Sequence, residues 1–451
     1  MRILIGGEDD LAVSLAEVLM QEHDVTVLAP TTMRGSSLDR LDVEVRWGFC
    51  SSSTALQAAH VEQADFFIAC TPADERNLVA AAAAKRLGAK QAICFLRRHE
   101  VQANEREAER LALSLGIDQV VLPAERLARE ILRIVMVPGA LDVAAFEGGR
   151  VRLVRKQIPE GSHMTTGPLR EIGVPKGVVL VTCRRGEDLF IPKGDTRFEP
   201  GDQITAMGDL RGINRFLTRY LSDRKRSDPR TATVVGGGVV GLRVAKGLES
   251  AGWSVKVIES NEKRANEIAQ QLKSMVIHGD GTDLELLASE YIGDDPVLIA
   301  VTSRDEVNLL VSLLAKHEGV PRIITRAERM SNELLFEKVG IDVVRSAQGA
   351  AISSVLRRIS RSRDEPIAEL EHGDLKVLRL PVRENFPPTP LAQMRAPVFA
   401  IVGAVSRGGN VIIPQGDTII EAGDTLLTLC TAEAEEEARS FFSNFSGASQ
   451  E

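Results

Sequence analysis

Aromatic residues, histidines and cysteines are scarce in this chain of 451 residues. Aromatic side chains make up only 4% of the sequence, and the net charge is −8, so we expect no nucleic-acid partner. The five cysteines show neither CxxC nor Cys/His spacing, which excludes a disulfide framework and a zinc site and indicates buried small apolar side chains. The seven histidines form no spaced cluster, and we predict no catalytic residue and no metal site.

Long apolar runs are also missing, since none approaches the roughly 18 residues that a membrane-spanning helix needs. The opening MRILIGGEDD has a strand pattern rather than the layout of a signal peptide. We therefore expect a soluble, cytosolic chain. Its length suggests three or four domains of roughly 100 to 150 residues each.

The chain repeats itself. The segment ACTPADERNLV from Ala69 matches AVTSRDEVNLL from Ala300, and one constant spacing pairs Thr71 with Thr302 and Asn77 with Asn308. A second block, IPKGDTRFEPGD from Ile191, recurs as IPQGDTIIEAGD from Ile413. Each half therefore carries the same two modules in the same order, which indicates duplication of a two-domain protein.

The larger module alternates apolar strands with amphipathic helices, which predicts a doubly wound, Rossmann-like domain with a parallel sheet covered on both faces. The smaller module has short strands and Gly-containing turns and predicts a small α+β domain without a catalytic constellation. The polar segment SDRKRSDPR, residues 222–230, is typical of a linker. The expected domains are Rossmann-like at 1–137, small at 138–222, Rossmann-like at 229–363 and small at 366–446.

The second Rossmann-like module carries the glycine fingerprint GGGVVG directly after a predicted strand. Gly236 permits the tight turn, Gly238 lets a pyrophosphate approach the backbone, and Gly241 lets the helix pack on the strand. Val239 and Val240 open the helix, whose N-terminal amides would meet phosphate oxygens. The pattern predicts a nucleotide site.

Glu259 closes the next predicted strand, which follows the helix that Gly241 helps to open. A carboxylate at this place accepts hydrogen bonds from ribose hydroxyls and repels a 2′-phosphate. The sequence therefore favours NAD(H) or adenosine nucleotides such as ATP and ADP over NADP.

The first copy departs from this pattern. Its turn reads GEDDLA, which places Asp9 where the second glycine belongs and Ala12 where the third belongs. Ala29 stands in the position of Glu259, and GFCSS at Gly48 replaces GDGTD. A carboxylate at the second position would repel a pyrophosphate, so we expect the first copy to keep the fold without a functional dinucleotide site.

The combination GGGVVG, HGDGTD, AVTSRDEVNL, ITR and IPQGDTIIEAGD resembles the TrkA-type regulators of bacterial potassium uptake, over essentially the whole chain. Such proteins carry tandem RCK or KTN lobes, each with a nucleotide-binding and a small C-terminal part. The resemblance implies a non-enzymatic regulatory subunit that senses NAD(H) or ATP/ADP. It would form a homo-oligomeric ring, a tetramer in the family, and lie peripherally on the cytoplasmic face against a membrane-embedded Trk-type potassium transporter.

The resemblance also assigns residues. Asp280, with its neighbour Gly281, would lie near the adenine, and Thr302 near the phosphates. The family tends to carry two arginines after the fifth strand that meet phosphate, whereas this chain has CFLR with Arg97 in the first copy and TRAE with Arg326 in the second.

Two alternatives stay open. An NAD-dependent oxidoreductase would need a catalytic group near the site, where His278 is the only histidine and is better explained as a strand-end residue or a neighbour of the adenine. A regulator of another cation transporter or of an efflux system would fit the same lobes, because the sequence names no partner.

Overall fold

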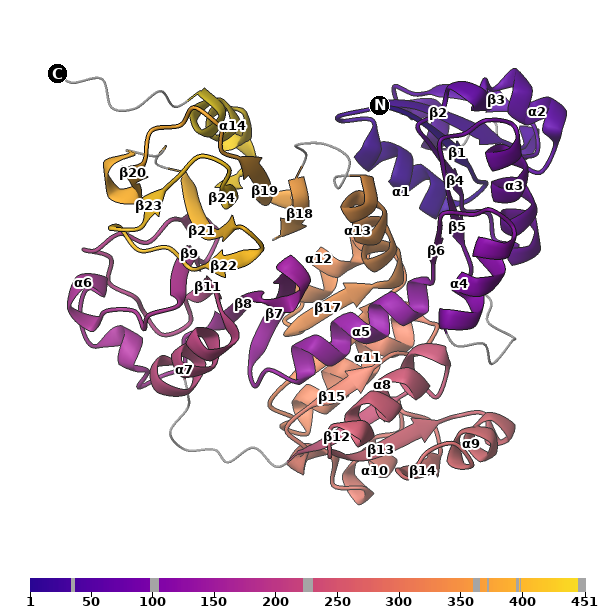
Figure 1. Ribbon diagram of the computed structural model, residues 1–451. Helices are drawn as coiled ribbons and strands as arrows, with labels where there is room; N and C mark the ends of the chain where they lie inside the picture. The colour runs from indigo at the N-terminus through magenta and orange to yellow at the C-terminus, as the bar shows by residue number, and fades with distance from the viewer. Residues whose placement is uncertain are drawn as a thin grey trace.

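The computed structural model describes all residues except 34–36, 98–104, 222–229, 360–365, 371–372, 395–396, 398 and 445–451. Most of the predicted linker, 222–230, lies outside the described residues. The described residues form two parallel sheets flanked by helices and two smaller five-stranded antiparallel sheets, in the order large, small, large, small (Figure 1). A further antiparallel sheet of two short strands lies in the second small unit.

The first parallel sheet has the strand order β3-β2-β1-β4-β5-β6, so the strand order reverses between β1 and β4. Its strands are β1 Arg2–Gly6, β2 Asp24–Ala29, β3 Glu44–Trp47, β4 Phe66–Ala69, β5 Gln91–Phe95 and β6 Gln119–Val121. Its helices are α1 Asp10–Leu19, α2 Ser53–Ala58, α3 Asp74–Arg86 and α4 Glu105–Ser114. We call residues 1–121 the first lobe.

The second parallel sheet repeats this order as β14-β13-β12-β15-β16-β17. Its strands are β12 Thr231–Val235, β13 Ser254–Glu259, β14 Met275–His278, β15 Leu298–Ala300, β16 Ile323–Ala327 and β17 Val343–Ser346. Its helices are α8 Val239–Ser250, α9 Glu262–Ala269, α10 Leu284–Ser289, α11 Asp305–His317 and α12 Met330–Lys338. Residues 230–346 are the second lobe, and the predicted pair of doubly wound domains is confirmed.

Two helices that follow these sheets cross over between the lobes. Helix α5, Pro123–Val135, comes after the first sheet, yet its apolar face packs into the core of the second lobe beside α8 (Figure 1). Helix α13, Ala347–Ile359, comes after the second sheet and packs into the core of the first lobe beside α1. Each lobe is therefore completed by a helix from the other half of the chain.

The crossover of α5 is fixed at both of its ends. Near its start, Glu125 forms an ion pair of 2.7 Å with Arg243 of α8. At its end, the guanidinium of Arg322 in the second lobe donates to the carbonyl oxygen of Ile134 at 3.0 Å. In between, α5 and α8 are so close that a Cβ at Gly247 would lie 2.4 Å from Cδ1 of Leu132.

The two small units are antiparallel sheets that pack face to face, which confirms the predicted small α+β domains. The first consists of β7 Ala140–Phe146, β8 Val151–Gln157, β9 Val178–Arg185, β10 Asp188–Phe190, β11 Gln203–Gly208, α6 Leu169–Ile172 and α7 Leu210–Tyr220. The second consists of β18 Pro366–Leu370, β19 Leu375–Pro381, β20 Thr389–Pro390, β21 Ala400–Arg407, β22 Asn410–Ile412, β23 Ile419–Ile420, β24 Thr425–Thr431 and α14 Glu435–Asn444. Their shared core includes Val181 and Met207 from one sheet and Leu427 and Leu429 from the other.

Candidate functional site

The glycine-rich loop of the second lobe joins β12 to α8 at the carboxyl edge of the sheet, where the strand order reverses. Gly236 has φ +106°, and a Cβ there would lie 2.9 Å from the backbone nitrogen of Thr302. A Cβ at Gly241 would lie 1.8 Å from the carbonyl oxygen of Gly236. These two glycines are therefore required by the backbone itself.

Gly238 differs from both. It begins α8 with ordinary backbone angles, φ −65° and ψ −168°, and no atom lies within 4 Å of the place where its Cβ would be. No side chain caps this helix end, where Val239 and buried Val240 form the first turn. The first amides of a helix have no acceptor within it, so this end presents donors to an open space.

Glu259 lies beside this loop. One carboxylate oxygen accepts from the backbone nitrogen of Gly237 at 2.7 Å, and the other accepts from that of Asn261 at 2.8 Å. Arg264, in the first turn of α9, donates from Nε to the carbonyl oxygen of Gly237 at 2.8 Å. Sequence reasoning missed Arg264, although it lies shortly after the acid, at a place where the helix returns to the loop.

Asp280 follows β14 and is exposed. Its carboxylate accepts from both the backbone nitrogen of Thr282 at 2.9 Å and its hydroxyl at 2.8 Å, and these hydrogen bonds lower the pKa of Asp280, which keeps it ionised. Gly281 next to it fits against the loop strand, since a Cβ there would lie 2.4 Å from Cγ1 of Val235. Gly281 thus joins this turn to β12, whereas the hydrogen bonds of the Asp280 carboxylate stay within its own turn.

Thr302 and Arg326 are held by one side chain, that of buried Asn308. Its Oδ1 accepts from the backbone nitrogen of Thr302 at 2.8 Å and from the hydroxyl at 2.7 Å. Its Nδ2 donates to the carbonyl oxygens of Thr302 and Arg326 at 3.1 and 3.0 Å. The Arg326 guanidinium forms an ion pair with Glu328. The sequence analysis identified Asn308 only as the repeat partner of Asn77. It did not predict that the Asn308 side chain joins the loops at Thr302 and Arg326.

His278 lies at the end of β14, with its Nε2 3.2 Å from the carbonyl oxygen of Ser260. Across the described residues, no three His, Cys, Asp or Glu side chains gather as metal ligands. All five cysteines are buried and free, as the sequence predicts.

The corresponding turn of the first lobe has another geometry. Asp9 is the N-cap of α1, which is the position of Gly238 in α8. The backbone amide of Gly48 donates to the carbonyl oxygen of Ala29 at 2.9 Å, and that of Gly279 donates to the carbonyl oxygen of Glu259 at 3.0 Å. Ala29 therefore occupies the place that Glu259 has in the second lobe. Gly7 is not among the residues with positive φ, unlike Gly236, and this different turn accommodates the Cβ of Ala12.

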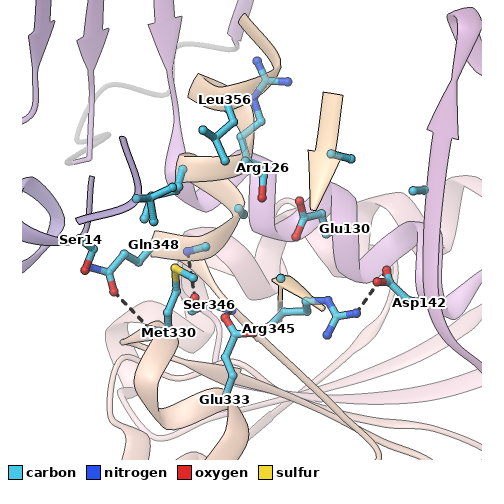
Figure 2. A pocket seen from close by; sticks show the side chains of 18 of the residues that line it. Ser14, Arg126, Glu130, Asp142, Met330, Glu333, Arg345, Ser346, Gln348 and Leu356 are labelled. Atoms are coloured by element: carbon cyan, nitrogen blue, oxygen red, sulfur yellow. Dashed lines mark hydrogen bonds and ion pairs between the residues drawn. The ribbon is translucent and has the colours of Figure 1, made fainter. Parts of the chain in front are cut away.

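A large cavity of about 1190 Å³ lies where the two lobes meet, between α1, α5, β7, α12 and α13. None of the predicted nucleotide-site residues lines it. Figure 2 shows Arg345 and Asp142 pointing toward each other in this cavity, with 3.2 Å between Nη2 and Oδ1. Gln348 of α13 donates to the Ser14 hydroxyl of α1 at 2.9 Å. The cavity is thus crossed by contacts that join the two halves.

No helix among the described residues combines the length and the apolar character that crossing a membrane would require.

Comparison with known proteins identifies all four units. The TrkA-N domain family matches residues 3–123 and 232–347, and the TrkA-C domain family matches residues 153–220 and 389–443. The chain is 32% identical to the Trk system potassium uptake protein TrkA homolog of Archaeoglobus fulgidus, over 98% of this chain and 100% of that protein. It is 30% identical to the Trk system potassium uptake protein TrkA of Haemophilus influenzae, over 95% of each chain.

Solved structures share the fold at lower identity. The GsuK RCK domain superposes with a TM-score of 0.62 at 19% identity, covering 98% of this chain and 94% of that one. The GsuK channel bound to NAD gives a TM-score of 0.62 at 19% identity, covering 98% of this chain and 78% of that one.

Proposed function

This chain belongs to the TrkA family, and we propose that it is the nucleotide-sensing regulatory subunit of a Trk-type potassium transporter. The family membership supports the link to potassium uptake, since full-length relatives carry that name. The observation that carries the sensing role is the loop at Gly238, which is open above a helix N-terminus and flanked by a carboxylate.

We propose NAD(H) or ATP/ADP as the ligand of the second lobe. The amides of the first turn, from Gly238 through Gly241, would hold the phosphates, and Arg326 would add a positive charge. Glu259 has four lone-pair sites and uses two for amides, so it can still accept from ribose hydroxyls. One structural neighbour, the GsuK channel, is bound to NAD, which supports the same class of ligand.

We assign Asp280 and Gly281 to the adenine side of this site, and Thr302 to the phosphate side. Thr302 faces the turn at Gly236, and Asn308 ties Thr302 to the strand that carries Arg326. A ligand that contacts this set would therefore touch the ends of β12, β13, β14, β15 and β16 together.

We infer a regulatory rather than an enzymatic role, because binding alone can do the work. A ligand shifts a conformational equilibrium only by its differential affinity for the two states, and about 1.4 kcal/mol gives a tenfold shift. Helix α8 starts at the glycine-rich loop and packs along α5, which belongs to the first half of the chain. A ligand that moves α8 would therefore move the first half as well.

The self-association surface we propose is apolar and lies on helices that face away from the core. Leu335 on α12 is 55% exposed, and Leu310 on α11 is 46% exposed. On the first lobe, Leu111 and Leu113 of α4 are also exposed. Pairing of such faces between chains would build a ring, for which we propose a tetramer with eight Rossmann-like lobes.

In this proposal each chain contributes four domains to the ring, namely residues 1–137, 138–222, 229–363 and 366–446. We place it on the cytoplasmic face of the membrane, held there by the membrane-embedded transporter subunit.

The test is calorimetric titration of the chain with NAD, NADH, ATP and ADP, compared with Gly238→Asp and Gly238→Ala. Both variants should fold, because Gly238 has ordinary backbone angles and empty space beside it. We expect at least one nucleotide to bind the unaltered chain, and Gly238→Asp to abolish that binding. Failure of all four nucleotides, or unchanged binding by Gly238→Asp, would refute the assignment.

Regulation needs a second assay. Cells that lack the chain and are complemented with it should regain potassium uptake that responds to nucleotide state. Complementation with Gly238→Asp should give uptake that does not respond to nucleotide state. An equal response in both strains would show that the site at Gly238 does not regulate the transporter.

A further inference from the structure

Three successive acids in the turn of the first lobe each meet a different arginine. Glu8 pairs with Arg76 of α3 at 2.5 Å. Asp9 is held by both terminal nitrogens of Arg97, which lies shortly after β5. Asp10 pairs at 2.6 Å with Arg329, which comes from the second lobe.

At the matching positions, the second lobe has no counterparts of Glu8, Asp9, Arg76 and Arg97. Gly237 and Gly238 stand in place of Glu8 and Asp9. The constant spacing that pairs Asn77 with Asn308 also matches Arg76 with Val307 and Arg97 with Glu328.

The structure supports that register. Arg97 and Glu328 both donate from the backbone nitrogen at 2.7 Å, to Asp74 and to its repeat partner Asp305. The first lobe therefore carries two negative and two positive charges that compensate one another and that the second lobe lacks at the matching positions.

These charges occupy the region that corresponds to the open space above Gly238. Asp9 begins α1 and accepts from the backbone nitrogen of Ala12 at 3.4 Å, so its carboxylate lies at the helix N-terminus. The Arg97 side chain spans from Asp9 to the carbonyl oxygen of Cys70, which follows β4, at 2.6 Å. Both Asp9 and Arg97 are about three-quarters buried, with exposed fractions of 24% and 25%. Bidentate pairing of this kind is what an arginine makes with a phosphate.

We propose that the first lobe is self-liganded: the carboxylates of Glu8 and Asp9 stand where nucleotide phosphates lie in the second lobe, and Arg76 and Arg97 hold them there. The first lobe then exchanges no nucleotide, and each chain binds one. The proposed function enters only in locating the phosphate position, since the ion pairs themselves do not depend on it.

The third acid, Asp10, connects the self-liganded first lobe to the second lobe, which we propose binds the nucleotide. Arg329 lies three residues beyond Arg326 of the second site, and it reaches Asp10 of α1. Gln348 of α13 also donates to the carbonyl oxygen of Asp10 at 3.0 Å. The loop that would meet phosphate in the second lobe therefore abuts the turn that carries its own anions in the first.

The test opens the first site in a chain whose second site is closed. Gly238→Asp is the background, and the opened variant adds Glu8→Gly and Asp9→Gly. Pyrophosphate is the first probe, because Ala29 offers no ribose acceptor, and ADP is the second. We expect no binding in the background, one pyrophosphate per chain in the opened variant, and at least a tenfold loss when Arg97→Ala is added.

A gentler variant guards against misfolding. Asp9→Asn in the same background keeps the size and the capping oxygen of the side chain but removes the charge that pairs with Arg97. Pyrophosphate should raise the melting temperature of this variant and leave that of the background unchanged.

The proposal is overturned if pyrophosphate affects neither the folded opened variant nor Asp9→Asn, or if Arg97→Ala makes no difference. These outcomes are separate from the fate of the proposed function. That function fails when the unaltered chain binds no nucleotide, which is measured at the other lobe.

Discussion

Asn308 offers the sharpest test of the second site, because its direct counterpart in the first lobe serves as a control. Asn77 makes the same four hydrogen bonds, to the nitrogen, hydroxyl and carbonyl oxygen of Thr71 and to the carbonyl oxygen of Phe95, at 2.7 to 2.9 Å. Both amides are fully buried. Replacement by alanine therefore removes the same interactions in either lobe.

The expected cost follows from the groups left behind. Asn308→Ala leaves the nitrogen and carbonyl oxygen of Thr302 and the carbonyl oxygen of Arg326 without this partner. A buried polar group without a partner costs about 1–3 kcal/mol. Thr302 is half-buried, so water can replace part of the loss, and we expect Asn308→Ala to lose about 2–4 kcal/mol of unfolding free energy. Thr71 is buried, so Asn77→Ala should lose at least as much.

Binding should separate the two variants. Asn308→Ala releases the loop at Thr302 and should weaken nucleotide binding at least tenfold, while Asn77→Ala should leave it unchanged. Urea unfolding can be followed lobe by lobe, since the two tryptophans are Trp47 at the end of β3 and Trp253 before β13, and each can be replaced by phenylalanine in turn. Equal effects of both variants on binding would refute the argument that the second lobe alone is the sensor.

Three further predictions concern charges and thiols. Glu328→Ala should tighten ADP binding about twofold to fivefold in a titration, because it frees the Arg326 guanidinium from an exposed ion pair; weaker binding would count against a phosphate contact by Arg326. The pKa of Glu130 is raised, because the effect of burial exceeds the opposing effect of the Arg345 and Arg133 charges. The folded state therefore holds this proton more strongly than the unfolded state does, and the free energy of unfolding falls as the pH rises above the unfolded pKa. Glu130→Gln should therefore melt at a higher temperature than the unaltered chain at pH 7 and at the same temperature below about pH 4, and a lower melting temperature at pH 7 would contradict this. Burial raises the pKa of the Cys50 thiol to about 11, and all five cysteines are buried, so a thiol reagent at pH 8 should count five thiols only after unfolding; rapid labelling of the folded chain would contradict this.

The duplication made most of the fold predictable from the sequence. The alternation of apolar strands and helices, read twice, predicts both parallel sheets, and the alignment of GEDDLA with GGGVVG places Asp9 at the helix start where it is found. Glycines at Gly236 and Gly241 were also predictable in physical terms, because the contacts that exclude a Cβ come from the local turn and its helix.

The exchange of helices α5 and α13 was not predictable in the same way. The apolar residues Leu127, Ile131 and Ile134 follow the spacing of a helix face, but that spacing does not say which sheet the face covers. Contacts between residues far apart in the sequence determine which sheet α5 covers. One of them joins Arg322 of the second lobe to the carbonyl oxygen of Ile134 near the end of α5. The family's arginine element grouped Arg97 with Arg326, whereas the constant spacing of the repeat matches Arg326 with Phe95. The structure agrees with that spacing, because Asn77 binds the carbonyl oxygen of Phe95 and Asn308 binds that of Arg326.

The asymmetry of the two sites and the exchange of the two helices together determine how a signal can travel. If each lobe were completed by its own helix, a ligand at Gly238 could move α8 against its own sheet without consequence for the first half. Because α5 packs on α8, and α13 packs on α1, that movement is passed to the neighbouring lobe. A first lobe whose site is filled by its own carboxylates keeps one arrangement at any nucleotide concentration. The second lobe would then move against a fixed reference, so a ligand's differential affinity for the two arrangements would bias the position of one half relative to the other.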